Sequence, residues 1–190
     1  NPFPQFPFLD ILMHVARYIA DEYRPYFCTI TVLDWIPIFI DLRYIEPLIE
    51  SLTYSRANKG LLLFAFVVMP NHLHAIAAAH DLHAVMRDLK RFTSRTIHDR
   101  LVADGRQTAL NWLDTASQLA RHARGEFSFW QDGFHPQVIY TRDVFEQKLR
   151  YLHENPVRKR LVAAPDDWWY SSAGWYAGRK NVCMVMDHFD

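Results

Sequence analysis

Apolar and polar positions along the chain alternate with two different periods. Steps of three and four residues are typical of amphipathic helices, whereas runs of β-branched and aromatic side chains are typical of strands. The elements that these patterns predict are, in order, a helix over 9–23, a strand over 26–33, a helix over 41–58, strands over 61–69 and 72–79, a helix over 82–101, a strand over 135–141 and a helix over 143–155. After the first helix the order is β-α-β-β-α-β-α. This order favours an α+β fold, a ferredoxin-like split βαβ antiparallel sheet with helices on one face and an extra C-terminal helix.

Capping residues and a proline set the expected helix ends. Asp81 stands where it would cap the helix over 82–101. Asp143 and Glu146 have the spacing of a capping box at the start of the last helix. Pro156 predicts that this helix stops near Asn155, because the residue before a proline disfavours helical backbone.

The length of 190 residues fits one main domain. We expect an N-terminal helical arm over 1–24 and the main domain over 25–190. Residues 104–126 are polar and rich in alanine with a helical stretch, so we interpret them as an insertion within that domain.

Composition excludes several classes of protein. Half of the residues are apolar and 15% are aromatic, which is typical of a globular chain and not of a disordered one. Apolar runs fall short of the roughly 18–20 residues that span a bilayer, and the opening segment lacks a basic leader, so we expect no membrane association and a cytoplasmic location. Cys28 and Cys183 have no CxxC spacing, which favours a reducing compartment and argues against a zinc knuckle.

The formal net charge is zero, but the cationic side chains are clustered. Residues 87–100 and 158–160 form two basic stretches that could hold a phosphate backbone. The candidate nucleic-acid contacts are Arg87, Lys90, Arg91, Arg95, Arg158 and Lys159. The same stretches also fit ordinary solvated helix faces. The aromatic side chains of 127–134 either stack on unpaired bases or belong to the core.

Two histidines, His72 and His74, follow the turn of the predicted hairpin. Alternate residues of a strand project from the same face, about 6–7 Å apart, so both imidazoles could bind one divalent metal ion. Leu73 between them is expected to point into apolar packing. The pattern also fits two surface histidines that have no partner.

Tyr151 and Asn155 are four residues apart in the last predicted helix and therefore share a face. A phenolic oxygen is a nucleophile for phosphorus, and an amide oxygen is a hard ligand for a divalent cation. Phe145, Leu149 and Leu152 form an apolar stripe directed at the core. The same positions also fit a Tyr151 that packs at a sheet edge and an Asn155 that caps the helix.

Four segments stand in order along the chain: VVMPNHLHAI (67–76), FWQDGFHPQVI (129–139), YLHENPVRKRLV (151–162) and DWWYSSAGWY (167–176). Together they resemble the REP-associated tyrosine transposases and the wider group of HUH single-strand transposases that use one catalytic tyrosine. The resemblance covers roughly residues 24–190. One departure is Arg160, because the family usually has a glycine there, which suits left-handed backbone after a helix.

The resemblance implies an endonuclease and transposase that cuts single-stranded or hairpin DNA and rejoins it. By this resemblance His72, His74 and Asn155 bind a divalent metal ion, Mg²⁺ or Mn²⁺. Tyr151 is then the nucleophile that forms a 5′-phosphotyrosine, and the last helix is the catalytic helix. The substrate is expected at hairpin or palindromic repeats, and the sequence leaves open whether the chain works as a monomer or a homodimer.

Three other functions fit parts of the pattern. An RNA-recognition module has the same order of elements, but the strand LLLFAFVVM lacks its stacking aromatic pattern. A domesticated relative that binds hairpin DNA without transposition would retain the same residues. A structural zinc site is disfavoured, because neither cysteine is close in sequence to the two histidines.

Overall fold

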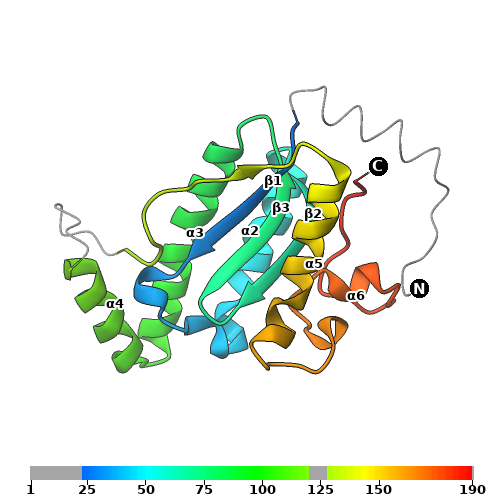
Figure 1. The fold of residues 1–190 in the computed structure, drawn as a ribbon. Coiled ribbons are helices and arrows are strands. Elements are labelled where there is room, and N and C mark those ends of the chain that lie inside the picture. Colours follow the sequence, from blue (N-terminus) through cyan, green and yellow to red (C-terminus); the bar gives the residue numbers. More distant parts are fainter. Residues whose placement is uncertain (1–22, 120–127, 190) are drawn as a thin grey trace.

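The computed structural model describes residues 23–119 and 128–189 (Figure 1). Its strands are β1 (Tyr26–Thr31), β2 (Leu62–Met69), β3 (His72–Ala78) and β4 (Gln137–Val138), and its α-helices are α2 (Glu46–Asn58), α3 (Leu82–Ala103), α4 (Gln107–Leu119), α5 (Arg142–Arg158) and α6 (Ala173–Tyr176). Four 3-10 turns are η1 (Leu33–Trp35), η2 (Ile38–Ile40), η3 (Leu42–Tyr44) and η4 (Pro165–Asp167). No described helix is long and apolar enough to cross a membrane.

The four strands form one antiparallel sheet in the order β2-β3-β1-β4. Strand β3 lies between β1 and β2, which are joined through α2, so the arrangement is the split βαβ sheet that the sequence predicts. The register places Thr29 of β1 opposite His74 and Thr31 opposite His72. The polar positions of β1 and β3 therefore meet side by side.

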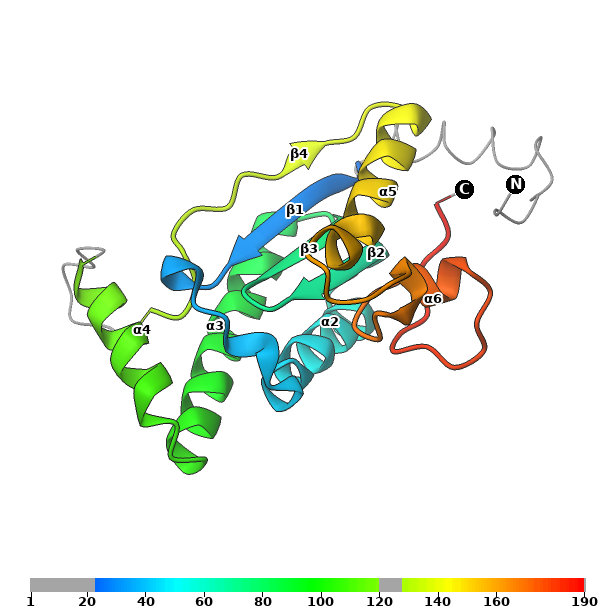
Figure 2. The ribbon, with the colours of Figure 1, turned by 60° about the horizontal axis from the view of Figure 1, so that its bottom comes forward.

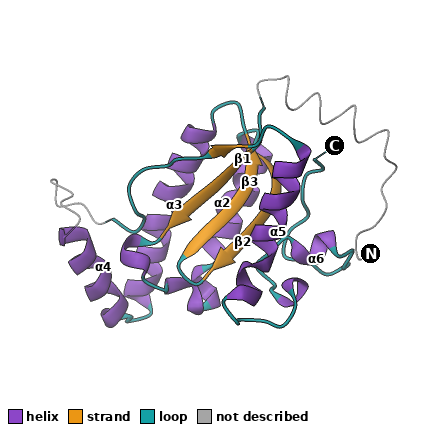
Figure 3. Ribbon diagram, in the orientation of Figure 1, coloured by secondary structure: helices purple, strands orange, loops and turns teal. Residues whose placement is uncertain are grey.

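Helices cover both faces of the sheet, as Figures 2 and 3 show. One core lies under α2 and α3 and includes Ile30 and Leu73, whereas the other lies under α5 and includes Phe27 and Ile76. Successive strand residues point to opposite faces, which is why neighbours such as Leu73 and His74 separate. Helix α5 is thus the extra C-terminal helix, and it packs on the second face of the sheet.

A β-bulge in β2 interrupts the alternation of side chains between the two faces of the sheet. The pairing with β3 shifts between Leu63 and Ala65, so Phe64 and Ala65 both pack in the α5 core while Leu63 and Phe66 both pack under α2 and α3. An extra residue in one strand lets two consecutive side chains serve one layer. The bulge therefore gives the α5 face a large aromatic anchor.

The C-terminal segment covers the free edge of β2. The amide of Val68 donates to the carbonyl of Tyr170, and the amide of Ser172 donates to the carbonyl of Phe66, both at 2.9 Å. The indole of Trp168 donates to the carbonyl of Val68 at 2.9 Å. An exposed strand edge pairs readily with other chains, so the W-x-YSS stretch has a structural task in closing this edge.

The predicted start of the second helix is wrong. Residues 41–45 form a 3-10 turn and a link, and α2 begins at Glu46 with Pro47 in its first turn. Proline suits a helix start, because the amide that it lacks would have no helical partner there.

Both predicted ends of the last helix also differ. Helix α5 begins at Arg142 behind Thr141, whose hydroxyl accepts the amide of Val144 at 3.3 Å. Asp143 and Glu146 therefore form no capping box, and Glu146 pairs with Arg142 at 2.9 Å instead. Pro156 lies inside the helix, which continues to Arg158. The proline removes only one helical hydrogen bond within the last turn, where few remain to be lost.

The predicted insertion forms α4, whose buried Leu110 and Leu113 join the core under α2 and α3. Residues 120–127 of that segment lie outside the described residues, as do residues 1–22 of the predicted arm.

The predicted strand over 135–141 is confirmed only over β4. The helix over 82–101 is confirmed, and Asp81 caps it by accepting the amide of Ala84 at 2.8 Å.

Candidate functional site

The histidine pair lies on the sheet face that α5 covers. The rings of His72 and His74 are 4.5 Å apart between centroids, while Leu73 points into the opposite core. Both histidines are buried. The alternative of two surface histidines without partners is therefore wrong.

Each imidazole is held through its Nδ1 atom. His72 Nδ1 lies 2.7 Å from the side-chain oxygen of Asn71, and His74 Nδ1 lies 2.8 Å from the Thr29 hydroxyl. The Asn71 oxygen can only accept, so Nδ1 of His72 carries the proton and Nε2 keeps its lone pair. Metal-binding histidines commonly donate their second ring N–H in this manner.

Both imidazoles are neutral near pH 7. Burial, together with the positive charge of Lys159, lowers the pKa of His72 to about 4. Burial lowers the pKa of His74 to about 3, and the charge that His72 carries when protonated and the charge of Lys148 act in the same direction. A neutral imidazole is the form that ligates metal ions.

Helix α5 brings Tyr151 to the histidines. Its ring lies 5.6 Å from that of His74 and 5.9 Å from that of Phe27. Phe145 and Leu152 anchor the helix in the core below, as the apolar stripe predicts. Tyr151 itself is 39% exposed, so its hydroxyl belongs to a side chain that is fixed by neighbours yet open to solvent.

Asn155 follows Tyr151 by one helical turn. It is buried within α5, so the alternative of a helix cap is wrong. Its amide nitrogen donates to the carbonyl of Tyr151 at 2.9 Å. Among the interactions of the described residues its side-chain oxygen accepts none, which leaves this oxygen as a buried acceptor beside the tyrosine.

The chemistry of these donors fits a divalent metal ion. Neutral imidazole nitrogens and an amide oxygen are donor types that divalent ions accept. Within 23–119 and 128–189, no cluster of three His, Cys, Asp or Glu side chains is found. Closed zinc sites are built from four Cys and His ligands, and Cys28 lies in the opposite core.

Two of the predicted cations lie at the site. The guanidinium of Arg158 is 5.5 Å from the centre of the Tyr151 ring and pairs with Glu154 at 2.5 Å. The charge of Lys159 acts on His72. Lys148 also belongs here, because its ammonium lies 4.8 Å from the centre of the Phe27 ring.

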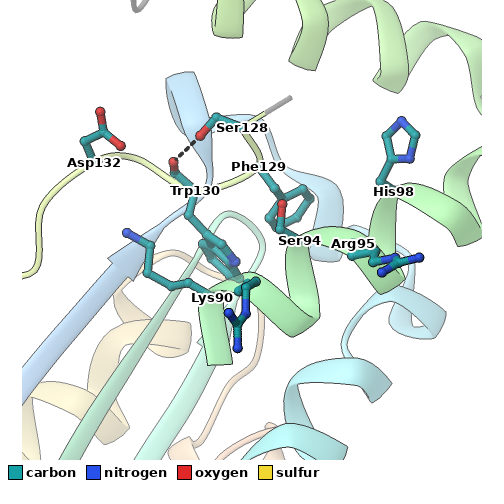
Figure 4. Close-up of a pocket in the computed structure, with 9 residues that line it drawn as sticks. Lys90, Ser94, Arg95, His98, Ser128, Phe129, Trp130 and Asp132 are labelled. Atoms are coloured by element: carbon teal, nitrogen blue, oxygen red, sulfur yellow. Dashed lines mark hydrogen bonds between the residues drawn. The ribbon is translucent and has the colours of Figure 1, made fainter. Parts of the chain in front are cut away.

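The other four predicted cations lie on α3, which covers the opposite face of the sheet. Arg87 and Arg91 pair with Asp88, at 3.7 and 3.3 Å. The ammonium of Lys90 donates to the carbonyl of Gln131 at 2.7 Å. Lys90 and Arg95 line a cavity between α3 and residues 128–132 (Figure 4), and its volume is about 410 Å³. The structure does not bring these cations to the histidines.

The aromatic segment over 127–134 belongs mainly to the core. Phe129 and Trp130 are buried, and the Trp130 indole donates to Thr93 at 3.0 Å. Phe134 is partly buried against the same core, and Phe127 lies outside the described residues. Of the two alternatives for Phe129 and Trp130, the structure therefore supports the core, because their side chains are only 1% and 3% exposed.

Sequence reasoning missed Thr29, Asn71 and Trp35 as parts of the site. The sequence does hold a sign of Thr29, because it is a polar residue in a strand that is otherwise mostly apolar. In the sheet it lies opposite His74. Asn71 lies in the turn between β2 and β3, where asparagine is common for reasons of turn geometry alone. The ring of Trp35 lies 6.0 Å from that of His72, a neighbourhood that no sequence spacing indicates.

Comparisons with known proteins bear on the fold. No protein-family model and no curated protein matches the chain. A solved structure of a REP-associated tyrosine transposase bound to a REP hairpin matches with a TM-score of 0.60 and 17% identity, over 88% of this chain and 87% of that one. A crystal structure of a putative transposase from Deinococcus radiodurans R1 matches with a TM-score of 0.42 and 16% identity, over 70% and 90%. The first comparison shows that the described chain has the fold of a REP-associated tyrosine transposase.

Proposed function

We propose that this chain is a metal-dependent transposase that cuts single-stranded DNA at hairpin or palindromic repeats and rejoins it through Tyr151. The observation that carries the proposal is the 5.6 Å separation of the Tyr151 and His74 rings. A solvent-accessible phenol beside two neutral, buried imidazoles combines a nucleophile for phosphorus with ligands for a divalent ion.

Three further observations support this function. Asn155 lies one turn from Tyr151 on the same helix, and its side-chain oxygen accepts no hydrogen bond from the described residues. The solved transposase with this fold is bound to a REP hairpin, which supports a hairpin substrate for this chain. Arg158 and Lys159 place positive charge at the site, where an anionic DNA backbone would lie.

The reaction follows from these positions. His72, His74 and Asn155 would hold Mg²⁺ or Mn²⁺, which would supply polarisation of the scissile phosphate. The oxygen of Tyr151 attacks phosphorus, and its proton passes to solvent. The bond from phosphorus to the 3′ oxygen breaks, and that oxygen takes up a proton to become a hydroxyl. A 5′-phosphotyrosine remains, and attack by another 3′-hydroxyl reverses the step and rejoins the strand.

A covalent adduct tests the proposal. Wild-type protein with Mn²⁺ and a labelled single-stranded hairpin should give a protein–DNA species that survives denaturing electrophoresis. Tyr151→Phe removes only the hydroxyl, so the adduct should disappear while the melting temperature changes little.

Tyr140→Phe is the matched control, because Tyr140 is exposed in the segment before α5. Its variant should form the adduct as wild type does. An adduct that persists in Tyr151→Phe, or one that needs no divalent ion, contradicts the mechanism. Equal reaction with a blunt duplex contradicts the single-strand substrate.

A further inference from the structure

A large aromatic side chain is exposed at the rim of the histidine pair. Trp35 is 56% exposed, although it belongs to the turn η1 that directly follows β1. Its indole meets the His72 ring edge to face, with centroids 6.0 Å apart and planes at 75°. One side of the indole is therefore held at the candidate site, and the rest faces solvent.

The backbone around this indole is held in an unfavourable conformation. Asp34 and Trp35 have φ angles of 50° and 59°, a left-handed region that side chains with a β-carbon disfavour. Consecutive residues of this kind persist only where the surroundings impose them, and they gather at functional sites. The turn η1 therefore presents an indole to solvent beside His72 despite this backbone strain.

Hydrogen bonds connect the strained turn to the histidine. The amide of Trp35 donates to the carbonyl of Val32 at 3.0 Å. The side-chain nitrogen of Asn71 donates to the carbonyl of Trp35 at 3.1 Å, and the oxygen of the same amide meets His72 at 2.7 Å. The side chain of Asn71 thus links the backbone of Trp35 to the imidazole of His72.

The surroundings indicate what this indole would bind. Lys159 places positive charge near His72, which favours an anionic partner. An exposed indole favours a binding partner with a flat, apolar surface. An unpaired nucleotide offers both, because single-strand binding proteins stack successive bases on aromatic side chains while cations follow the backbone. The buried Phe129 and Trp130 cannot take this part.

We propose that Trp35 is a stacking platform for an unpaired nucleobase that flanks the phosphate attacked by Tyr151. The inference rests on the proposed function and adds a binding position to it. Stacking tolerates every base, so Trp35 contributes affinity and alignment of the strand, with little selection of sequence. A duplex presents no free base face, so the platform also favours single strands.

The experiment measures the affinity of a labelled single-stranded hairpin by fluorescence anisotropy. Trp35→Ala should weaken binding roughly 5- to 150-fold, which is the range for loss of one stacked base. Trp35→Phe should keep most of the affinity, whereas Trp35→Leu, which keeps apolar bulk without a ring, should not. Tyr54→Ala is the matched control: Tyr54 is 58% exposed, but it lies on α2 across the sheet.

A series of abasic hairpins locates the contact. Removing the base that stacks on Trp35 should weaken wild type and leave Trp35→Ala unaffected, so the two losses do not add. Wild-type affinity in Trp35→Ala, or additive losses at every abasic position, overturns the stacking role even where the Tyr151 adduct forms. A wild-type protein that binds no single-stranded DNA overturns the proposed function as well. If Trp35→Ala changes only the oligomeric state, the indole contacts a second copy, and the proposal is wrong.

Discussion

The side-chain oxygen of Asn71 lies 2.7 Å from Nδ1 of His72, and the nitrogen of the same amide donates to the carbonyl of Trp35. Because the side-chain nitrogen of Asn71 donates to the Trp35 carbonyl, the side-chain oxygen is the atom that faces the imidazole of His72. Asn71 therefore selects the His72 tautomer whose Nε2 is free to bind a metal ion. A turn residue thus acts as a positioning residue for its neighbour.

Asn71→Ala should weaken Mn²⁺ binding by about 10- to 100-fold, the usual effect of losing a hydrogen-bond partner of a ligating histidine. Isothermal titration calorimetry of the DNA-free protein measures it without any turnover. Asn71→Asp keeps an acceptor for Nδ1 and should retain most of the affinity. Asn58→Ala, an exposed asparagine of α2, should have no effect. Equal metal affinity in Asn71→Ala and wild type would show that Asn71 does not position the ligand.

Arg160→Gly should stabilise the fold. Arg160 follows α5 with a φ of 58°, which confirms the left-handed position that a glycine would suit. Relief of this strain exceeds the extra chain entropy of glycine, for a net gain of about 0.5–1 kcal/mol in the free energy of unfolding. Urea denaturation measures the change. Lys159→Gly, at a φ of −87°, should be destabilising, and a gain there would contradict the conformational explanation.

Ser172→Ala should be destabilising by about 2 kcal/mol. The buried Ser172 hydroxyl accepts the amide of Phe66 at 3.0 Å and lies 2.8 Å from Nε2 of His153. Truncation leaves both groups without this partner in the core at the β2 edge. Ser171→Ala removes a single acceptor, for the amide of Ala173, and should cost less. Equal losses in urea denaturation would contradict the central place of Ser172.

The two groups of cations should differ in DNA binding. Arg158 and Lys159 lie at the site, whereas Arg87 and Arg91 lie across the sheet and pair with Asp88. A double Arg158→Ala, Lys159→Ala variant should reduce the salt dependence of binding to a short single strand, by about 0.7 in the logarithmic slope per cation. The double Arg87→Ala, Arg91→Ala variant should keep the wild-type slope. A reduced slope only in the Arg87→Ala, Arg91→Ala variant would show that the single-stranded DNA binds along α3.

Local sequence patterns predicted much of the fold. The alternation in β3 correctly separates Leu73 from the two histidines, because side-chain direction along a strand depends only on position. Asp81 is confirmed as a cap for the same local reason. The start of α5 could not be predicted, because Thr141 and Asp143 are both capping residues and lie two positions apart. The end of α5 predicted from Pro156 was also wrong. The helix continues to Arg158, because packing of α5 on the sheet outweighs one lost hydrogen bond.

By itself the sequence determined that His72 and His74 share one strand face and that Tyr151 and Asn155 share one helix face. Only the tertiary structure decided that these two faces meet, because α5 packs on the side of the sheet opposite α2 and α3. It also separated the basic stretch of α3 from the site and brought Trp35 to His72. Backbone periodicity is a local property, which a sequence pattern records directly. The choice of sheet face for a helix depends instead on apolar burial summed over residues far apart in the chain, to which no single spacing corresponds.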